Sequence, residues 1–261
     1  MIDKGPSLGS DTAPLLFVHG AWHGAWCWDE HFLDFFAAKG YRSLAVSLRG
    51  HGKSPVPKAR RLCSVADYVE DVASVADGLP TRPVLVGHSL GGFVVQKYLE
   101  QHDAPCAVLL ASIPPSGITR FLLGRFKLRP WLTARSLGAG KTLRGIGGTP
   151  ELARESFFSP PLPDADVERY AAQLGEEYVG KWVLDLLLLD LPKPNLVTTP
   201  VSVLGAENDI VFTQREVRAT AAAYHTEADF VPKMAHDVML EPGWAHVAER
   251  IHAWIETRCR V

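Results

Sequence analysis

The sequence predicts one α/β fold: a mostly parallel sheet flanked by helices, with a long helical insertion. Three observations support this prediction. Short apolar runs alternate with helical patterns, one run leads directly into Gly-x-Ser-x-Gly, and the runs stop between Ile113 and Pro200. Continuous apolar runs are typical of strands buried on both faces, as in parallel sheets. A chain of 261 residues with 47% hydrophobic content is long enough to bury a full core.

Six apolar runs are predicted strands, and five helical patterns separate or follow them. The strands are expected over 15–18, 41–48, 83–86, 107–111, 201–204 and 228–231. The helices are expected over 28–39, 64–79, 92–99, 214–224 and 242–257. Two local signals mark helix ends. Gly40 suits a left-handed C-terminal cap, and Ser64 with Asp67 three residues later suits an N-terminal cap.

The stretch between Ile113 and Pro200 contains no convincing strand but has three helical patterns, over 150–157, 164–174 and 180–191. A loop of that length is not structureless inside a compact domain. We therefore predict a core made of 1–112 and 198–261, and a helical cap made of 113–197. The cap is expected to lie over the carboxyl ends of the strands, where open α/β sheets bind ligands.

Composition excludes several classes of protein. The net charge of −2 gives no attraction to nucleic acid, and no apolar stretch reaches membrane-spanning length. The segment 1–12 lacks the apolar core of a signal peptide. The four cysteines are far apart in sequence and form no Cys-x-x-Cys, which predicts reduced thiols in a cytoplasmic protein. The oligomeric state is left open, a homodimer included.

The motif Gly87-His88-Ser89-Leu90-Gly91 lies between a predicted strand and a predicted helix. This context is that of a nucleophile elbow, which lifts a serine hydroxyl clear of the sheet. The glycines leave room where the helix closes onto the strand. Ser89 is therefore the predicted nucleophile, at a helix N-terminus whose dipole favours negative charge. The alternative is a plain turn from strand to helix.

Two later strands are followed by an acid and a histidine, at the same edge of the sheet as Ser89. In this architecture the partners of the serine come in the order acid, then histidine. Asp209 is the preferred acid because the apolar residues 210–212 can anchor its loop, and Glu207 is the alternative. His236 is the predicted base, since it alone among the histidines lies in the loop directly after the last strand.

The oxyanion hole is expected to use the backbone N–H groups of Leu90 and Ala21, the second from the loop after the first strand. His19 in that loop is predicted to have a structural role, as are His51 and His88. The histidines show neither His-x-His nor His-Glu-x-x-His spacing, so no metal is predicted. The chemistry requires no cofactor.

Taken together, these motifs resemble the α/β-hydrolase superfamily. The resemblance covers nearly the whole chain, in the segments 19–20, 49–54, 87–92, 205–211 and 235–242. It implies the α/β-hydrolase fold, with a helical cap inserted after the sixth strand. The first apolar run begins too near the start of the chain to allow the family's first two strands, so we expect a sheet of about six strands.

Within the superfamily, residues 19–28 resemble the plant methylesterase and hydroxynitrile lyase branch. The lyases of that branch carry threonine in place of Gly20 and lysine in place of Asp237, so the resemblance favours the esterases. A serine nucleophile disfavours haloalkane dehalogenases and epoxide hydrolases. The segment 235–242 is also similar to bacterial carboxylesterases and lysophospholipase-like hydrolases.

The predicted function is hydrolysis of small, mostly apolar carboxylic esters through an acyl-enzyme. Two other classes stay open: another reaction on the same scaffold (carbon–carbon bond hydrolysis, thioester or lactone hydrolysis, or lyase chemistry), and a ligand receptor without turnover. Trp22, Phe157, Phe158, Trp182 and Leu186 are candidates for an apolar substrate pocket, with packing between cap and core as the alternative.

Residues 116–150 contain basic side chains and no acid. The basic residues are Arg120, Arg125, Lys127, Arg129, Arg135, Lys141 and Arg144. Such a run is most simply a solvated face; the alternative hypothesis is that it attracts anionic head groups or anionic substrates.

Overall fold

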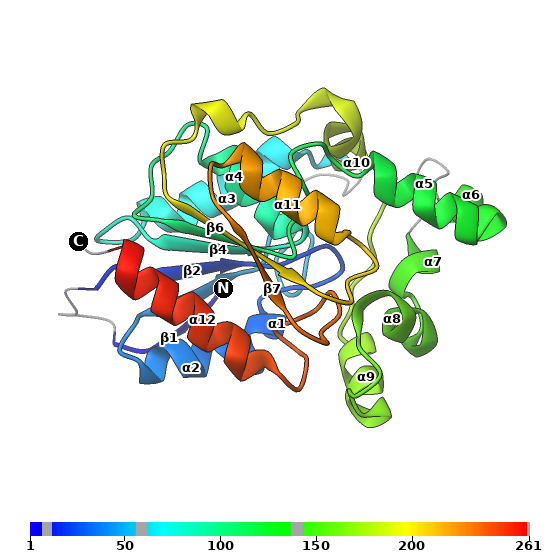
Figure 1. Cartoon of the computed structure of the whole chain (residues 1–261), viewed down its shortest axis with the longest axis horizontal. Helices are drawn as coiled ribbons and strands as arrows, with labels where there is room; N and C mark the ends of the chain where they lie inside the picture. The colour runs from blue at the N-terminus through cyan, green and yellow to red at the C-terminus, as the bar shows by residue number, and fades with distance from the viewer. Residues whose placement is uncertain (7–11, 56–61, 137–142, 260–261) are drawn as a thin grey trace.

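Seven strands form one sheet, and six of them run parallel. The computed structural model describes residues 1–6, 12–55, 62–136 and 143–259 of the chain. The order across the sheet is β1-β3-β2-β4-β5-β6-β7 (Figure 1). The strands are β1 Ile2–Lys4, β2 Leu15–Val18, β3 Ser43–Val46, β4 Val84–His88, β5 Ala107–Leu110, β6 Val201–Ala206 and β7 Ala228–Val231. The prediction of an α/β fold with a mostly parallel sheet is confirmed.

The strand β1 corrects the expected count of about six. It pairs antiparallel with β3, with Ile2 opposite Ala45, at the edge of the sheet. Its side chains are not fully buried, and the arginine Arg42 holds it through two hydrogen bonds from the guanidinium to Asp3, of 3.2 and 2.8 Å. A three-residue edge strand held by backbone pairing has no apolar run, which is the signal that predicted the other strands.

Helices cover both faces of the sheet. Figure 1 shows α2 and α12 on one side of the strands and α3, α4 and α11 on the other. The bounds are α1 Trp26–Asp29, α2 Phe32–Ala38, α3 Val65–Asp77, α4 Leu90–Tyr98, α11 Gln214–Ala223 and α12 Trp244–Arg258. Every residue of β2 to β6 is buried, as a sheet covered on both faces requires.

Local capping signals are confirmed, with one change. Ser64 and Asp67 form a reciprocal capping box at the start of α3, and Gly40 has the left-handed φ of +90°. The single helix expected over 28–39 is two helices, α1 and α2. The break falls at His31, whose φ is −147° and whose ring stacks on Trp244 of α12 at 4.6 Å. Packing against a distant helix thus interrupts a continuous helical pattern.

The segment 113–197 between β5 and β6, called the insertion below, is mostly helical in its described residues. Its helices are α5 Thr119–Leu128, α6 Pro130–Ser136, α7 Arg144–Gly147, α8 Pro150–Phe157, α9 Asp164–Ala171 and α10 Lys181–Leu184, followed by the short turns Asp185–Leu189 and Pro194–Leu196. The helix expected over 150–157 has these bounds, and those expected over 164–174 and 180–191 are present but shorter. The helices α5, α6 and α7 were not expected. The insertion follows β5, the fifth strand of this chain.

Cys106, beside the start of β5, and Cys259, just after α12, form a disulfide, with their Cα atoms 5.8 Å apart. The expectation of four reduced thiols is therefore wrong for this pair. The two cysteines are separated by 153 positions, so only the packing of α12 beside the sheet brings them together. Among the residues described, no helix combines the length and apolar character needed to span a bilayer.

Candidate active site

Ser89 occupies the sharp turn between β4 and α4. Its φ and ψ of 50° and −115° are unusual for a residue other than glycine, and a Cβ on its neighbours would not fit. On Gly87 it would lie 2.6 Å from the Gly91 carbonyl oxygen, and on Gly91 it would lie 2.2 Å from the Val18 carbonyl oxygen. The Gly-x-Ser-x-Gly pattern is thus required by the close approach of α4 to β2 and β4.

His236 lies between Ser89 and Asp209. The Ser89 hydroxyl donates to His236 Nε2 at 3.0 Å, and His236 Nδ1–H donates to Asp209 Oδ2 at 2.8 Å. The other oxygen of Asp209 accepts from the N–H groups of Val211 and Phe212, at 2.7 and 3.2 Å. These hydrogen bonds connect the Asp209 carboxylate, the His236 ring and the Ser89 hydroxyl in one chain.

Glu207, the alternative acid, faces elsewhere. Its Oε2 accepts from the Lys233 N–H at 3.0 Å. The carboxylate in contact with His236 is therefore that of Asp209. Both side chains of the His236–Asp209 pair are almost completely buried, so water does not screen their attraction.

Charge controls the basicity of His236. Burial alone would lower the pKa of its imidazole, but the negative charge of Asp209, the hydrogen bond to it and the nearby Asp237 outweigh burial, so the pKa of His236 is raised above its usual value. A raised pKa makes the ring a stronger proton acceptor for the Ser89 hydroxyl.

The loop after β2 brings Ala21 beside the elbow. His19 donates from Nδ1 to the Gly20 carbonyl oxygen at 2.7 Å and accepts at Nε2 from the Leu48 N–H at 3.1 Å. Burial, with the neighbouring His51, lowers the pKa of His19 well below its usual value, so the neutral ring that these bonds need is stable. His19 thus shapes the loop, as expected for a structural histidine.

The insertion holds the next residue of this loop, Trp22, from both sides. Trp22 has a left-handed φ of +65°. Its N–H donates to the buried carboxylate of Glu177 at 2.9 Å, and its carbonyl oxygen accepts from the Gly175 N–H at 2.6 Å. Glu177 also accepts from Nε2 of the buried His51. Sequence reasoning missed Glu177, because no local pattern distinguishes it from the acidic residue before it.

Two backbone donors remain available beside Ser89. Within the described residues, the N–H groups of Ala21 and Leu90 donate to no protein acceptor, whereas that of Trp22 is occupied by Glu177. The two residues expected to form the oxyanion hole thus have donors that a ligand can use.

A model described as the alpha/beta hydrolase family matches residues 15–246. The chain belongs to the alpha/beta hydrolase family. The resemblance drawn from the motifs is confirmed at this level.

The solved structures agree with the family assignment. A thermophilic esterase of Thermogutta terrifontis superposes with a TM-score of 0.75 over 99% of this chain and 93% of that chain. The sequence identity is 19%, so this likeness shows a common fold.

Curated relatives match this chain over shorter stretches. A non-heme chloroperoxidase of Streptomyces lividans is 37% identical over 117 residues, which cover 43% of this chain and 40% of that protein. A pFDCC methylesterase of Arabidopsis thaliana is 31% identical over 162 residues, which cover 58% of this chain and 60% of that protein. The matched segments span about half the length of these relatives.

An apolar pocket opens onto Ser89 and His236. Its other lining residues are Ala21, Trp22, Val211 and Phe212 of the core segments, with Ile113, Ile118, Phe121, Leu122, Leu143, Ile146, Phe157, Trp182 and Val183 of the insertion. The cavity holds about 50 Å³, which is small for a ligand site.

The predicted substrate residues fall into two groups. Trp22 and Trp182 line the pocket, as does Phe157. Phe158 does not; its ring packs on Tyr170 at 5.8 Å. Leu186 is fully buried and also lies outside the lining, with its carbonyl oxygen accepting from Ile118. The apolar spacing of 118, 121 and 122, one helical face, was the signal that could have revealed the α5 wall.

A second buried histidine–aspartate pair, His23 and Asp237, lies beside His236. His23 Nε2 donates to Asp237 Oδ2 at 3.0 Å, and His23 Nδ1 donates to the Ala21 carbonyl oxygen at 2.7 Å. Both ring nitrogens of His23 thus face oxygen atoms. Burial would raise the pKa of Asp237, but the charge of His23 and the hydrogen bond from it outweigh burial and lower that pKa.

Among the described residues, His88, His236 and Asp237 are the one group with metal-ligand spacing. Both nitrogens of His236 bond to Ser89 and Asp209, and His88 Nε2–H donates to the His236 carbonyl oxygen at 3.0 Å, whereas the buried atoms His88 Nδ1 and Asp237 Oδ1 have no hydrogen-bond partner in the described part of the chain. Burial, with the nearby His236, lowers the pKa of His88 to about 3, so this ring is a neutral donor. The group fits a hydrogen-bond network better than a metal.

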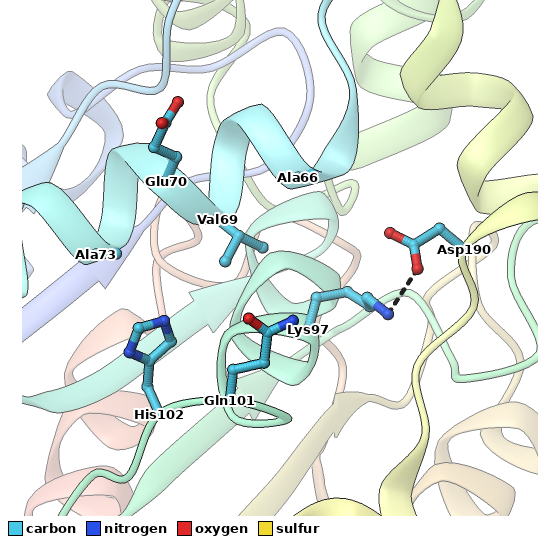
Figure 2. A pocket seen from close by; sticks show the side chains of 8 residues that line it. All are labelled: Ala66, Val69, Glu70, Ala73, Lys97, Gln101, His102 and Asp190. Atoms are coloured by element: carbon cyan, nitrogen blue, oxygen red, sulfur yellow. Dashed lines mark ion pairs between the residues drawn. The ribbon is translucent and has the colours of Figure 1, made fainter.

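Figure 2 shows a different pocket, lined by α3, α4 and Asp190, which shares no lining residue with the one at Ser89. Lys97 of α4 donates to Asp190 at 2.7 Å and to Glu100 at 2.9 Å. Burial would lower the pKa of Lys97, but these two carboxylates raise it. Because Asp190 belongs to the insertion, this ion pair ties the insertion to the core.

Proposed function

We propose that this hydrolase cleaves carboxylic esters of small, mostly apolar molecules, with Ser89 as nucleophile, His236 as general base and Asp209 as its orienting acid. The observation that carries the proposal is the position of the His236 ring, 3.0 Å from the Ser89 oxygen and 2.8 Å from the Asp209 oxygen. A hydroxyl, an imidazole and a carboxylate in this order form the relay that activates serine nucleophiles.

In the first half-reaction, Ser89 Oγ attacks the ester carbonyl carbon while its proton passes to His236 Nε2. The carbonyl oxygen becomes negatively charged, and the N–H groups of Ala21 and Leu90 are the proposed donors to it. When the intermediate collapses, the carbon–oxygen bond to the alcohol breaks. The leaving oxygen takes the proton from His236 and departs as the alcohol.

In the second half-reaction, water attacks the acyl carbon and gives a proton to His236. The second intermediate collapses by breaking the bond to Ser89 Oγ, which recovers the proton from His236. The products are the carboxylic acid and the free enzyme. Asp209 stays ionised throughout and stabilises the imidazolium. No cofactor takes part in either half-reaction.

We propose that residues 1–112 and 198–261 form a catalytic core and that residues 113–197 form a helical cap over it. Side chains from both parts line the pocket at Ser89, which supports a cap that selects substrates. Trp22 and Trp182 are the proposed substrate contacts. Phe158 and Leu186, proposed at first as substrate contacts, have surroundings that suit support of the pocket wall.

A second acyl acceptor is favoured by one observation, the similarity to a bifunctional esterase/perhydrolase of Acinetobacter calcoaceticus, 35% identical over 112 residues. Hydrogen peroxide can replace water as the attacking molecule on the same acyl-enzyme, and the product is then a peroxy acid. The candidate function is perhydrolysis of esters at the same three residues.

The disulfide removes one of the arguments for a cytoplasmic location. That argument depended on reduced thiols, and disulfides such as Cys106–Cys259 are rare in cytosolic proteins.

The test is a panel of short and medium acyl esters, thioesters and lactones, with water or hydrogen peroxide as acceptor. We expect sustained turnover of esters, a loss of about 10³-fold or more in Ser89→Ala and in His236→Ala, and no loss in the control His246→Ala, whose side chain is exposed on α12. A fluorophosphonate probe should label the native protein and not Ser89→Ala. A single turnover after which the product stays bound would favour a receptor instead.

A further inference from the structure

The two helices α5 and α6 form an arm that Figure 1 shows projecting from the body of the molecule. This arm carries an unusual concentration of exposed apolar side chains. Among the described residues, ten large apolar side chains are exposed, and four of them lie between 123 and 131. They are Leu123 (58% exposed), Phe126 (49%), Leu128 (72%) and Trp131 (87%). An exposed apolar cluster of this kind marks an interaction site.

The helix α5 is apolar on two faces. Its inner face contributes Phe121 and Leu122 to the wall of the pocket at Ser89. Its outer side carries Leu123 and Phe126, which the fold leaves in water. Packing among the described residues therefore explains the inner face only, and the outer side has no apolar partner in that part of the chain.

The charge on the arm is positive. The sequence has no Asp or Glu over 116–150, and Arg120 and Lys127 are exposed. Arg129 and Arg125 approach one acid, Glu155, at 2.5 and 3.8 Å. Arg120 also lies 3.8 Å from Glu216 of the core. The arm itself supplies no carboxylate, so the exposed Lys127 and Arg129 make the border of the apolar cluster basic.

We propose that this arm docks on an anionic lipid surface, with Trp131 and Leu128 entering the interface and the basic side chains facing the head groups. Tryptophan is enriched at the boundary between lipid and water, because its ring is apolar and its N–H is polar. Exposed apolar residues beside Lys and Arg are the pattern of segments that lie on membranes.

A second copy of the chain fits this surface less well. A symmetric dimer through the arm would place the basic residues of one arm against those of the other, and such like-charge contacts oppose association. An anionic lipid surface satisfies the charge and the apolar cluster together. Because α5 also walls the pocket, docking would bring the pocket to the surface from which an apolar substrate partitions.

The test measures binding to vesicles of phosphatidylcholine with and without phosphatidylglycerol, by sedimentation. It uses Ser89→Ala, so that binding is scored without ester hydrolysis and the outcome is independent of the proposed function. We expect at least about tenfold tighter binding to the anionic vesicles at low salt, and weaker binding as salt is added. Emission from Trp131, obtained by subtracting the spectrum of Trp131→Phe, should shift to shorter wavelength on binding.

Two variants and a control separate the parts of the proposal. The double variant Leu128→Ser, Trp131→Ala should bind at least about tenfold more weakly, because it removes two apolar anchors. Lys127→Glu should weaken binding to the anionic vesicles and leave binding to neutral vesicles unchanged. The control Leu196→Ser removes an exposed leucine outside the arm and should bind like the parent. Turnover of a water-soluble short ester, measured with Ser89 present, should be unchanged in all three, which shows that they are folded.

Two results would overturn the proposal. One is equal binding of the parent and the double variant to anionic vesicles. The other is a dimer in analytical ultracentrifugation that the double variant abolishes, with no binding to vesicles, since the occupant would then be a second copy.

Discussion

At the scale of single residues, the pair His236–Asp209 sets how the reaction responds to pH. His236 must be neutral to accept the Ser89 proton, so kcat/KM should fall as the pH drops through the pKa of His236. Because Asp209 raises that pKa, replacing the carboxylate with a neutral amide should lower it. The acidic limb of the pH profile therefore depends on Asp209.

For Asp209→Asn, we expect kcat/KM to fall by about 10³-fold or more and its acidic limb to move to lower pH. The measurement is the pH dependence of kcat/KM on a neutral ester. Glu207→Gln serves as the matched control and should keep the native profile, because Glu207 contacts Lys233 instead of His236. A native profile in Asp209→Asn would contradict the assignment.

Gly20 is a second position where the addition of one carbon atom is expected to disturb the site. A Cβ there would lie 2.9 Å from His88 Nδ1 and 3.0 Å from Ser89 Cβ. We expect Gly20→Ala to lower kcat by about 10²-fold through displacement of Ser89, with the fold retained. Initial rates and circular dichroism measure the two effects. In the control Gly124→Ala the new Cβ meets no neighbour, so activity should be native. Full activity in Gly20→Ala would show that the elbow adapts.

At the scale of elements, the insertion and the loop after β2 act on each other through Glu177. Its carboxylate holds the N–H of Trp22 and Nε2 of His51, and Trp22 is the neighbour of Ala21 in the proposed oxyanion hole. A shift of the insertion therefore moves the backbone on which the oxyanion donors depend.

We expect Glu177→Ala to lower kcat by about tenfold or more, because a buried N–H is left without an acceptor and the loop can relax. Glu177→Gln keeps an acceptor oxygen and should recover part of the rate. The readouts are kcat, KM and the rate of fluorophosphonate labelling. Glu176→Ala is the control, since that carboxylate accepts from Tyr178 instead. Equal rates in Ala and Gln variants would argue against positioning by this acceptor.

At the scale of the whole molecule, the disulfide joins the start of β5 to the end of the chain. A cross-link over 153 positions mainly restricts the unfolded chain, and such bonds contribute about 2–4 kcal/mol. We expect Cys259→Ser to lower the free energy of unfolding by that amount, with kcat little changed. Urea unfolding with and without reductant measures the loss. If reductant destabilises Cys259→Ser as much as the native chain, the effect comes from another source.

A feature could be predicted from the sequence when the residues that determine it are close together in the chain. Ser89 was found because the steric demands of the elbow fall on residues next to it in the chain. Asp209 and His236 were found because parallel strands end at one edge, so position after a strand implies position in space. In contrast β1, whose pairing depends on the backbone, has no apolar run to reveal it. Glu177 also lacks a signal, because its partners Trp22 and His51 are far from it in sequence.

By itself, the sequence determined the α/β architecture, the family and the residues that meet at Ser89, because periodicity and turn chemistry act over a few neighbouring positions. Only the tertiary structure decided which residues wall the pocket, that Cys106 reaches Cys259, that Glu177 holds Trp22, and that the α5–α6 arm is exposed. These contacts arise from packing between segments far apart in the chain. The free energy that selects them is burial and hydrogen bonding in three dimensions, which no local pattern records.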